Sequence, residues 1–246
     1  MFTVHVHAKN GLPLTENGYA AWHGFEQLGC HLRPFESLDE LRQQLRLGDC
    51  VVGYIADALF ALDHLDVPRP ASIDYPPELA AFYGRRLWAD TLGSIADHPE
   101  KWPVFVKSVA QKGFTGRVIA STRDLIGTAE QHQNRPVFCS EVVEFVSEWR
   151  GFVRHGCYAD ARRYAGRWDV FPDPAVMQAA LAAWPGCPAG CSIDFGVTAD
   201  GRTLVVECND GFALGHYGLN SLLYAKLISA RWHELAGAPD PFRWLR

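Results

Sequence analysis

Two acidic residues and an asparagine near the end of the chain have the types and spacing of a metal site. The stretch 190–218 contains two apolar runs on either side of Asp200-Gly201, a dipeptide typical of a two-residue β-hairpin turn. With that dipeptide at the tip, Asp194 pairs with Glu207 on the opposite strand. Their Cβ atoms would then lie about 4.5–5.5 Å apart, where like charges repel.

The same register pairs Phe195 with Val206 and divides the hairpin into two faces, because side chains alternate along a strand. The predicted core face carries Ile193, Phe195, Val197, Leu204, Val206 and Cys208. The other face carries Asp194, Gly196, Val205, Glu207 and Asn209. Two carboxylates and an amide oxygen suit Mg²⁺, with substrate phosphates filling its other positions. The alternative is an incidental acidic pair on a solvated hairpin, since a slip of one residue would undo the pairing.

A lysine at the end of an apolar strand precedes a glycine loop. Residues 103–107 read PVFVK, and KGFTG follows at 112–116. Glycines let backbone N–H groups approach anionic oxygens, and lysine adds a point charge, so the pair is typical of phosphate handling. It is not a P-loop, because the GxxxxGK[ST] spacing is missing and the lysine comes first. The alternative is a hairpin with a solvated lysine.

Three arginines follow on predicted strands: Arg150, Arg162 and Arg163. Their planar guanidinium groups are suited to binding carboxylate or phosphate. For each of them the alternative is surface charge paired with an acidic neighbour.

The elements that position these residues fall into two stretches. The first alternates strands and helices, which indicates a small α/β unit with a parallel sheet; strands are expected at 3–7, 31–35 and 49–55, and helices at 19–28 and 37–47. Ser37 and Glu40 form a capping box at the second helix. A proline-rich crossing at 67–77 and a helix at 78–88 lead to strands at 103–107, 118–119, 136–143, 144–154 and 161–164. Helices are expected at 172–184, with Asp173 as N-cap, and at 219–236.

Composition indicates a globular protein. The chain has 246 residues, of which 48% are hydrophobic and 21% charged, and a net charge of -5 argues against a broad nucleic-acid-binding surface. No apolar run is long enough to span a bilayer, and the first residues lack a signal peptide's basic start and apolar core. The seven cysteines include no CxxC pair and are expected to be reduced thiols, so we expect a cytoplasmic protein without membrane partners.

Taken together, these motifs resemble the ATP-grasp superfamily. The resemblance rests on the order VFVK, KGFTG, SEVV, EWR, RRY, SIDF and VVECND between residues 104 and 234. It implies an α/β (α+β) fold in which two lobes sandwich ATP, preceded by a small parallel α/β pre-ATP-grasp domain. The implied domains are 1–88 and 89–246, the second divided into a small lobe with the phosphate loop (89–143) and a large lobe with the magnesium site (144–246).

The resemblance also assigns roles to residues. Phosphates would contact Lys107, and the loop with Lys112, Gly113, Thr115 and Gly116 would close over them. Adenine would lie against the hinge at Ser140, Glu141, Val142 and Val143, with Glu144 or Glu148 on the ribose and Arg85 or Arg86 replacing an earlier phosphate-binding lysine. Arg150 and Arg162 would join Lys107 in catalysis, while Asp194, Glu207 and Asn209 would hold magnesium, two ions in all. His216 and Tyr217 would line the acceptor pocket or serve only in packing.

The implied activity is that of an ATP- and Mg²⁺-dependent, ADP-forming ligase. It would join a carboxylate to an amine, or to a thiol, through an acyl phosphate, with small molecules or peptides as substrates. This chemistry depends on charge neutralisation and in-line positioning, which agrees with the absence of an evident Ser/His/Asp or Cys/His constellation. The alternatives are a phosphotransferase on the same fold and a non-catalytic nucleotide-binding module.

Overall fold

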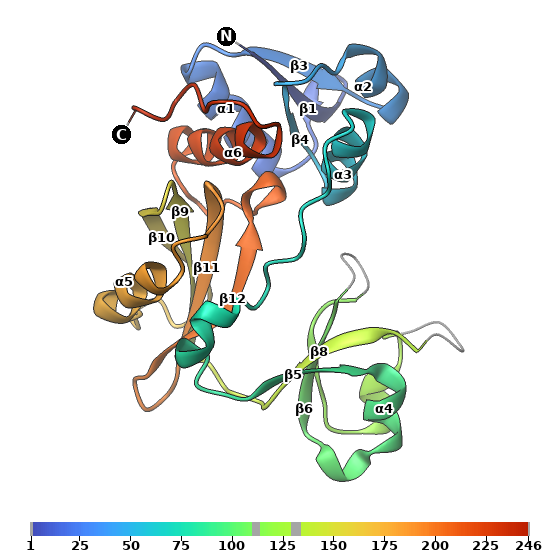
Figure 1. Cartoon of the computed structure of the whole chain (residues 1–246), viewed down its shortest axis with the longest axis vertical. Coiled ribbons are helices and arrows are strands. Elements are labelled where there is room, and N and C mark those ends of the chain that lie inside the picture. The colour runs from blue at the N-terminus through green and yellow to red at the C-terminus, as the bar shows by residue number, and fades with distance from the viewer. Residues whose placement is uncertain (1, 110–113, 129–133, 246) are drawn as a thin grey trace.

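Three four-stranded sheets make up the computed structural model, which describes residues 2–109, 114–128 and 134–245. Figure 1 shows the N-terminal sheet beside helix α6, the large sheet below them, and the small sheet set apart at the far end of the molecule. In these ranges no helix combines the length and apolar character needed to cross a membrane. The expected α/β fold is confirmed.

The N-terminal sheet is parallel, as its alternating strands and helices predicted. Its central strand β1 (Thr3–Lys9) lies between β3 (His31–Phe35) and β4 (Cys50–Val52), and the short β2 (Leu12–Pro13) runs antiparallel to the end of β1. Helices α1 (Glu16–Gln27) and α2 (Leu38–Gln44) connect the strands. The Ser37 hydroxyl accepts the Glu40 N–H at 3.2 Å, which confirms this N-cap.

One helix of this unit was not expected. The strand predicted at 49–55 ends at Val52, and helix α3 (Ile55–His64) begins three residues later. The Asp57 carboxylate accepts the Tyr54 backbone N–H at 2.7 Å and so satisfies a donor at the start of α3. A residue such as tyrosine at the N-cap hides this start from a search for Ser, Thr, Asp or Asn.

The small sheet is antiparallel, in the order β5 (Leu87–Thr91), β8 (Pro136–Ser140), β6 (Val104–Ser108) and β7 (Arg117–Ile119), and α4 (Leu92–Asp97) packs against it. Its 3₁₀ turns are η2 (Pro99–Lys101) and η3 (Thr122–Leu125). The helix predicted at 78–88 is wrong. A short 3₁₀ helix, η1 (Pro77–Phe82), ends before Gly84, whose φ of +59° lies outside the helical region, and β5 then pairs with β8.

The large sheet has the order β10 (Cys157–Gly166), β9 (Ser147–Arg154), β11 (Gly190–Val197) and β12 (Thr203–Asp210). One face packs under α5 (Pro174–Ala183), where Asp173 accepts the Ala175 N–H at 2.8 Å and caps the helix as predicted. After β12 come the 3₁₀ turn η4 (Gly211–Ala213) and the last helix, α6 (Ser221–Leu235).

The β11–β12 hairpin confirms one predicted pair and corrects the others. Its turn is a three-residue loop, 199–201, in which the Thr198 carbonyl accepts the Gly201 N–H at 2.9 Å and Gly201 has a φ of +84°. The longer loop shifts the register near the tip by one residue, so that Phe195 faces Val205 and not Val206.

A β-bulge at Val206 then restores the predicted pairing of Asp194 with Glu207. The bulge also exchanges two valines between the faces. Val205 is fully buried in the core beneath α5, whereas Val206 lines a cavity on the opposite side. The two predicted faces are therefore correct around the acidic pair and wrong at these valines.

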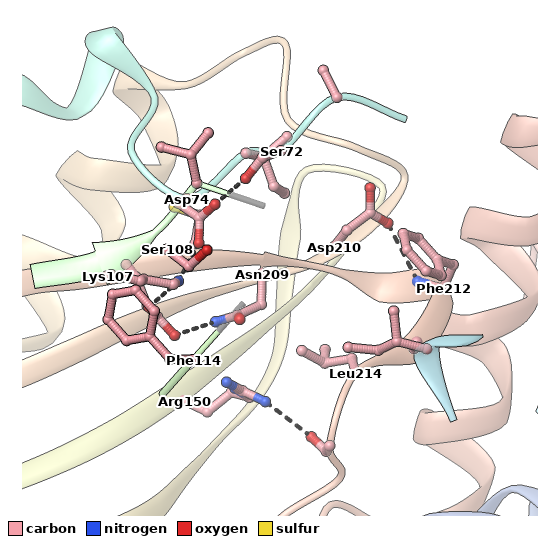
Figure 2. Close-up of a pocket in the computed structure, with 18 of the residues that line it drawn as sticks. Ser72, Asp74, Lys107, Ser108, Phe114, Arg150, Asn209, Asp210, Phe212 and Leu214 are labelled. Carbon is pink, nitrogen blue, oxygen red and sulfur yellow. Dashed lines mark hydrogen bonds and ion pairs between the residues drawn. The ribbon is translucent and has the colours of Figure 1, made fainter. Parts of the chain in front are cut away.

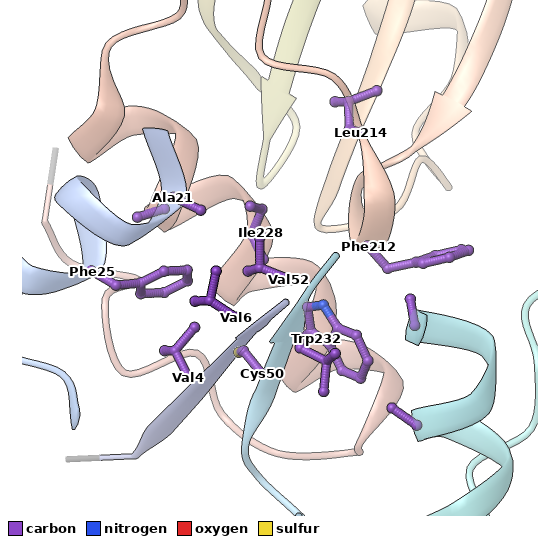
Figure 3. Close-up of a cluster of buried hydrophobic side chains, with 14 of the residues drawn as sticks. Val4, Val6, Ala21, Phe25, Cys50, Val52, Phe212, Leu214, Ile228 and Trp232 are labelled. Atoms are coloured by element: carbon purple, nitrogen blue, oxygen red, sulfur yellow. The ribbon is translucent and has the colours of Figure 1, made fainter. Parts of the chain in front are cut away.

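The N-terminal unit and the C-terminal helix share one hydrophobic core (Figure 3). Val4, Val6 and Phe25 pack with Ile228 and Trp232 of α6, and the same cluster includes Phe152 of β9 and Phe212 of η4. Helices α1 and α6 approach so closely that a Cβ atom on Gly24 would lie 1.9 Å from the Ser221 carbonyl oxygen. This packing supports the end of the large sheet from which β12 continues into η4.

Replacing Gly24 with alanine should therefore destabilise the whole protein. The added methyl meets backbone, which cannot turn aside as a side chain can, and overpacking of this kind costs about 1–3 kcal/mol of unfolding free energy. Gly186→Ala is the matched control, because a Cβ atom at Gly186 meets nothing within 4 Å. Urea unfolding of both variants checks this; equal midpoints would contradict the close approach of α1 and α6.

Candidate active site

Four charged residues form a row across the large sheet. Arg162 of β10 pairs with Arg150 of β9, Arg150 with Asp194 of β11, and Asp194 with Glu207 of β12. Directly paired residues of neighbouring strands point to the same side of a sheet, so all four side chains share one face. It is the face opposite α5.

The centre of the row is a buried ion pair. Arg150 Nε lies 2.9 Å from Asp194 Oδ1 and Nη2 lies 2.7 Å from Oδ2, with side-chain exposures of 7% and 1%. Burial disfavours the charged guanidinium, but Asp194 outweighs it, and the pKa of Arg150 lies above its ordinary value. The Asp194 oxygens also accept from Ser192 Oγ at 3.2 Å and Asn209 Nδ2 at 3.1 Å. Hydrogen bonds thus surround this carboxylate.

Next to this pair, Lys107 of the small sheet reaches the large sheet (Figure 2). Its ammonium lies 2.6 Å from Glu207 Oε2 and also contacts Asp74. Burial alone would lower the pKa of Lys107, but Glu207 and Asp74 outweigh it and raise that pKa above the usual lysine value. Asn209 Nδ2 donates to Glu207 Oε1 at 3.3 Å and so links Glu207 to Asp194.

Two cavities meet at this lysine. The first has a volume of about 510 Å³ and lies between the small sheet, the hinge and the large sheet. It brings together every predicted nucleotide-contacting residue that the structure describes: Arg85, Lys107, Thr115, Gly116, Ser140, Glu141, Val142, Val143 and Glu148. Lys112 and Gly113, predicted for the same loop, lie outside the described residues.

The choice between the two hinge glutamates has a geometric answer. Glu148 lines the first cavity, where the Tyr164 hydroxyl donates to its Oε2 at 2.8 Å. Glu144 is exposed and is not among the described residues that line this cavity. Burial, with the nearby carboxylates of Asp194 and Glu148, raises the pKa of Tyr164 far above its ordinary value, so its hydroxyl remains a donor.

The two arginines considered as substitutes for a phosphate-binding lysine have different surroundings. Arg85 lines the first cavity, but its guanidinium donates to the carbonyls of Val205 at 2.8 Å and Val206 at 2.7 Å, on the bulged strand. Arg86 lies with its guanidinium carbon 4.7 Å from the centre of the Trp88 ring. Of the two, Arg85 has the position from which to contact a bound phosphate.

The second cavity has a volume of about 420 Å³ and extends from Lys107 toward η4. Arg150, Glu207 and Asn209 line it, together with Tyr217 of the loop after η4. The Tyr217 ring stacks on Tyr164 with a centroid distance of 5.1 Å, and the Arg150 guanidinium lies 4.7 Å from its centre.

Other predicted residues contribute less directly. His216 lies next to Tyr224, at 5.7 Å between ring centres, and is not among the described residues lining either cavity. Arg162 lies on the site face but binds Asp160 with both Nε and Nη2, and its side chain is 43% exposed. It too is absent from the described residues that line the two cavities.

The donors fit magnesium at one end of the predicted set. Glu207 and Asn209 face the second cavity with carboxylate and amide oxygens, the ligands that Mg²⁺ prefers. Asp194 would have to release a hydrogen bond from Arg150, Ser192 or Asn209 before it could bind a metal. Within the described ranges, no group of three or more His, Cys, Asp or Glu residues is arranged to hold an ion.

Sequence reasoning missed Asp74, which contacts Lys107 from the proline-rich crossing. The Ser72 hydroxyl also contacts the Asp74 carboxylate, and both residues line the second cavity. The crossing runs along the edge of the large sheet, where the Asp74 carbonyl accepts the Cys208 N–H at 2.9 Å. No periodic pattern marks this segment, so its only signal was a single acid among prolines.

Comparisons with known proteins agree with this geometry. A family model for an ATP-grasp domain, the second family of its clade, matches residues 82–227. The comparison with curated protein sequences finds no match.

Similar solved structures share the fold at low sequence identity. D-cycloserine synthetase DcsG is 17% identical, with a TM-score of 0.58 over 96% of this chain and 100% of that chain. D-alanine–D-alanine ligase from Bacillus anthracis, complexed with ATP, is 14% identical, with a TM-score of 0.57 over 96% of each chain. The ATP-grasp ligase PsnB, complexed with a minimal precursor, is 17% identical, with a TM-score of 0.54 over 93% of this chain and 99% of that one.

The row of charges generates a prediction about stability. Arg150→Met should cost about 3–5 kcal/mol of unfolding free energy, because it leaves the buried Asp194 charge without its partner. Arg162→Met is the matched control from the same row and the same face; its exposed pair with Asp160 should contribute about 0–1 kcal/mol. Chemical unfolding measures both, and equal losses would show that Arg150 and Asp194 are not a buried pair.

Proposed function

Because the chain belongs to the ATP-grasp family whose domain model it matches, we propose that it is an ATP- and Mg²⁺-dependent, ADP-forming ligase that joins a carboxylate to an amine. The observation that carries the proposal is the place of Lys107 and Glu207. They form an ion pair between two sheets and line both cavities, so a phosphoryl group at this junction would be accessible from each side.

In this proposal the first cavity binds ATP. The adenine lies against the hinge from Ser140 to Val143, the ribose near Glu148, and the phosphates toward Lys107 beneath Thr115 and Gly116. Phe105 and Phe114 line the same cavity and provide apolar surface for the base. The proposed division into an N-terminal unit (1–88), a small lobe (89–143) and a large lobe (144–246) places the nucleotide between the two lobes.

Glu207 and Asn209 would hold magnesium at the junction. When bound, Mg²⁺ neutralises the charge of the phosphates during their transfer. Asp194 is the third predicted ligand. Unless it exchanges a hydrogen bond for the metal, it acts by orienting Asn209, whose amide it holds at 3.1 Å.

The second cavity would bind the carboxylate and the amine. A carboxylate oxygen attacks the γ-phosphorus of ATP, the bond to ADP breaks, and an acyl phosphate forms. The amine then attacks the acyl carbon, phosphate leaves, and the amine loses a proton, giving an amide. Lys107 lies where it can neutralise the transferred phosphoryl group in both steps, and Arg150 and Tyr217 shape the wall opposite.

Two relatives suggest the range of substrates. One is a D-alanine–D-alanine ligase and another is a ligase crystallised with a precursor, so both small molecules and peptides are reasonable acceptors to test. A cavity of about 420 Å³ is within the usual range for small-molecule sites.

The first test is nucleotide binding. Millimolar Mg-ATP should raise the melting temperature, since a ligand that binds only the native state stabilises it. Lys107→Ala should weaken binding by about tenfold or more, because a hydrogen bond to a charged group contributes about 1.5–3 kcal/mol. Lys101→Ala, on the exposed turn η2, is the control. Wild-type protein that is folded and shows no shift would refute the nucleotide assignment.

The second test is turnover. We expect ADP and phosphate to be released only when a carboxylate and an amine are both present, in a screen of such pairs; release with one substrate alone would favour a phosphotransferase. Glu207→Gln should abolish turnover without unfolding the protein, because it removes a metal-binding charge and keeps the side chain's size. Glu78→Gln, at an exposed position of η1, should remain active. Full activity of Glu207→Gln would remove Glu207 from the metal site.

A further inference from the structure

Asp74 occupies a built position beside the proposed phosphate-binding lysine. Its backbone carbonyl accepts the Cys208 N–H of β12 at 2.9 Å, and the next residue, Tyr75, packs its ring against Phe138 at 5.3 Å and Tyr83 at 5.9 Å. Only 15% of the Asp74 side chain is exposed. The residue lies outside the range 82–227 that matches the family model.

The junction of the two cavities has more negative than positive charge. Asp74 and Glu207 both contact the single ammonium of Lys107. The other ions nearby are already paired, since Arg150 binds Asp194, and Arg231 binds Asp210 at 2.7 and 2.6 Å. Among the described residues that line the cavities, the cations are Arg85, Lys107 and Arg150, and the carboxylates are Asp74, Glu141, Glu148, Glu207 and Asp210.

A phosphate bound to Lys107 would be close to Asp74. Both the carboxylate and the phosphate oxygen would be within hydrogen-bond distance of the same nitrogen, so they would lie no more than about 6 Å apart. At this separation, in a partly buried site, two negative charges repel strongly. Glu207 would be relieved of this repulsion by the metal that it binds, whereas Asp74 would keep its charge.

We infer that Asp74 is a specificity-determining residue that makes nucleotide binding depend on magnesium. It neutralises Lys107 before the nucleotide binds and disfavours a bare triphosphate, while a triphosphate carrying Mg²⁺ brings the positive charge that offsets Asp74. The inference rests on the proposed function, because it takes Lys107 as the phosphate contact. In thermodynamic terms, Asp74 raises the coupling free energy between the metal and the nucleotide.

The test compares ATP affinity with and without magnesium by calorimetry, in excess MgCl₂ and in EDTA. Asp74→Asn should bind metal-free ATP about tenfold more tightly than wild type, because one charge near the phosphates is gone. Its affinity for Mg-ATP should change by less than about threefold, so the preference for the metal complex shrinks. Asp74→Ser removes the same charge with a smaller side chain and serves if the asparagine variant does not fold.

Three controls bear on the cause. Asp74→Glu keeps the charge and should retain the wild-type preference for Mg-ATP. Asp200→Asn, at the exposed tip of the β11–β12 hairpin, should leave both affinities unchanged. In a Lys107→Met background, Asp74→Asn should change the ratio of the two affinities by less than it does in wild type, and the double-mutant cycle measures that difference.

Each remaining outcome overturns the inference. An equal loss of both affinities in Asp74→Asn would make Asp74 a residue that only positions Lys107. A loss confined to Mg-ATP would make it a metal ligand, and unchanged affinities would leave it without influence on the nucleotide. If wild type binds neither form of ATP, the proposed function fails, and the inference fails with it; if wild type binds Mg-ATP, the comparison concerns Asp74 alone.

Discussion

The buried pair of Arg150 and Asp194 is the interaction on which the site depends. It joins the two central strands of the large sheet, and each partner also holds a group that borders a cavity. Asp194 accepts from Asn209 at 3.1 Å, and Arg150 reaches the Gly215 carbonyl at 3.4 Å and lies against Tyr217. Two residues expected to bind ligands directly thus bind each other, and their energetic effect is transmitted to the groups that face the proposed substrate.

A second ion pair connects the lobes. Lys107 comes from the small sheet and Glu207 from the large sheet, and their 2.6 Å contact spans the space in which the proposed nucleotide would lie. The large sheet is supported from behind by α5 and at its end by the core that α6 shares with the N-terminal unit. The small sheet has its own apolar cluster, so the charged junction is where the lobes meet chemically.

Local signals predicted much of this structure, and non-local contacts account for the errors. Period-two alternation and the order of motifs were enough to bring the described nucleotide-contacting residues into one cavity. The helix predicted at 78–88 failed because β5 finds its partner, β8, in a distant part of the chain. Asp74 was missed because a sheet edge distant in sequence, at Cys208, determines where it lies. The burial of Arg150 against Asp194 likewise depends on pairing between strands, which no single segment encodes.

The hairpin shows how a correct result can come from two compensating errors. The predicted two-residue turn is one residue shorter than the real loop, and the bulge at Val206 adds one residue back, so Asp194 still faces Glu207. The bulge has a physical support that the sequence does not reveal, because the guanidinium of Arg85 donates to the carbonyls of both Val205 and Val206. An arginine considered for phosphate binding therefore also holds the register of the strand that carries Glu207. Since bulges re-aim side chains next to functional sites, the alignment of the acidic row depends on this contact from outside the hairpin.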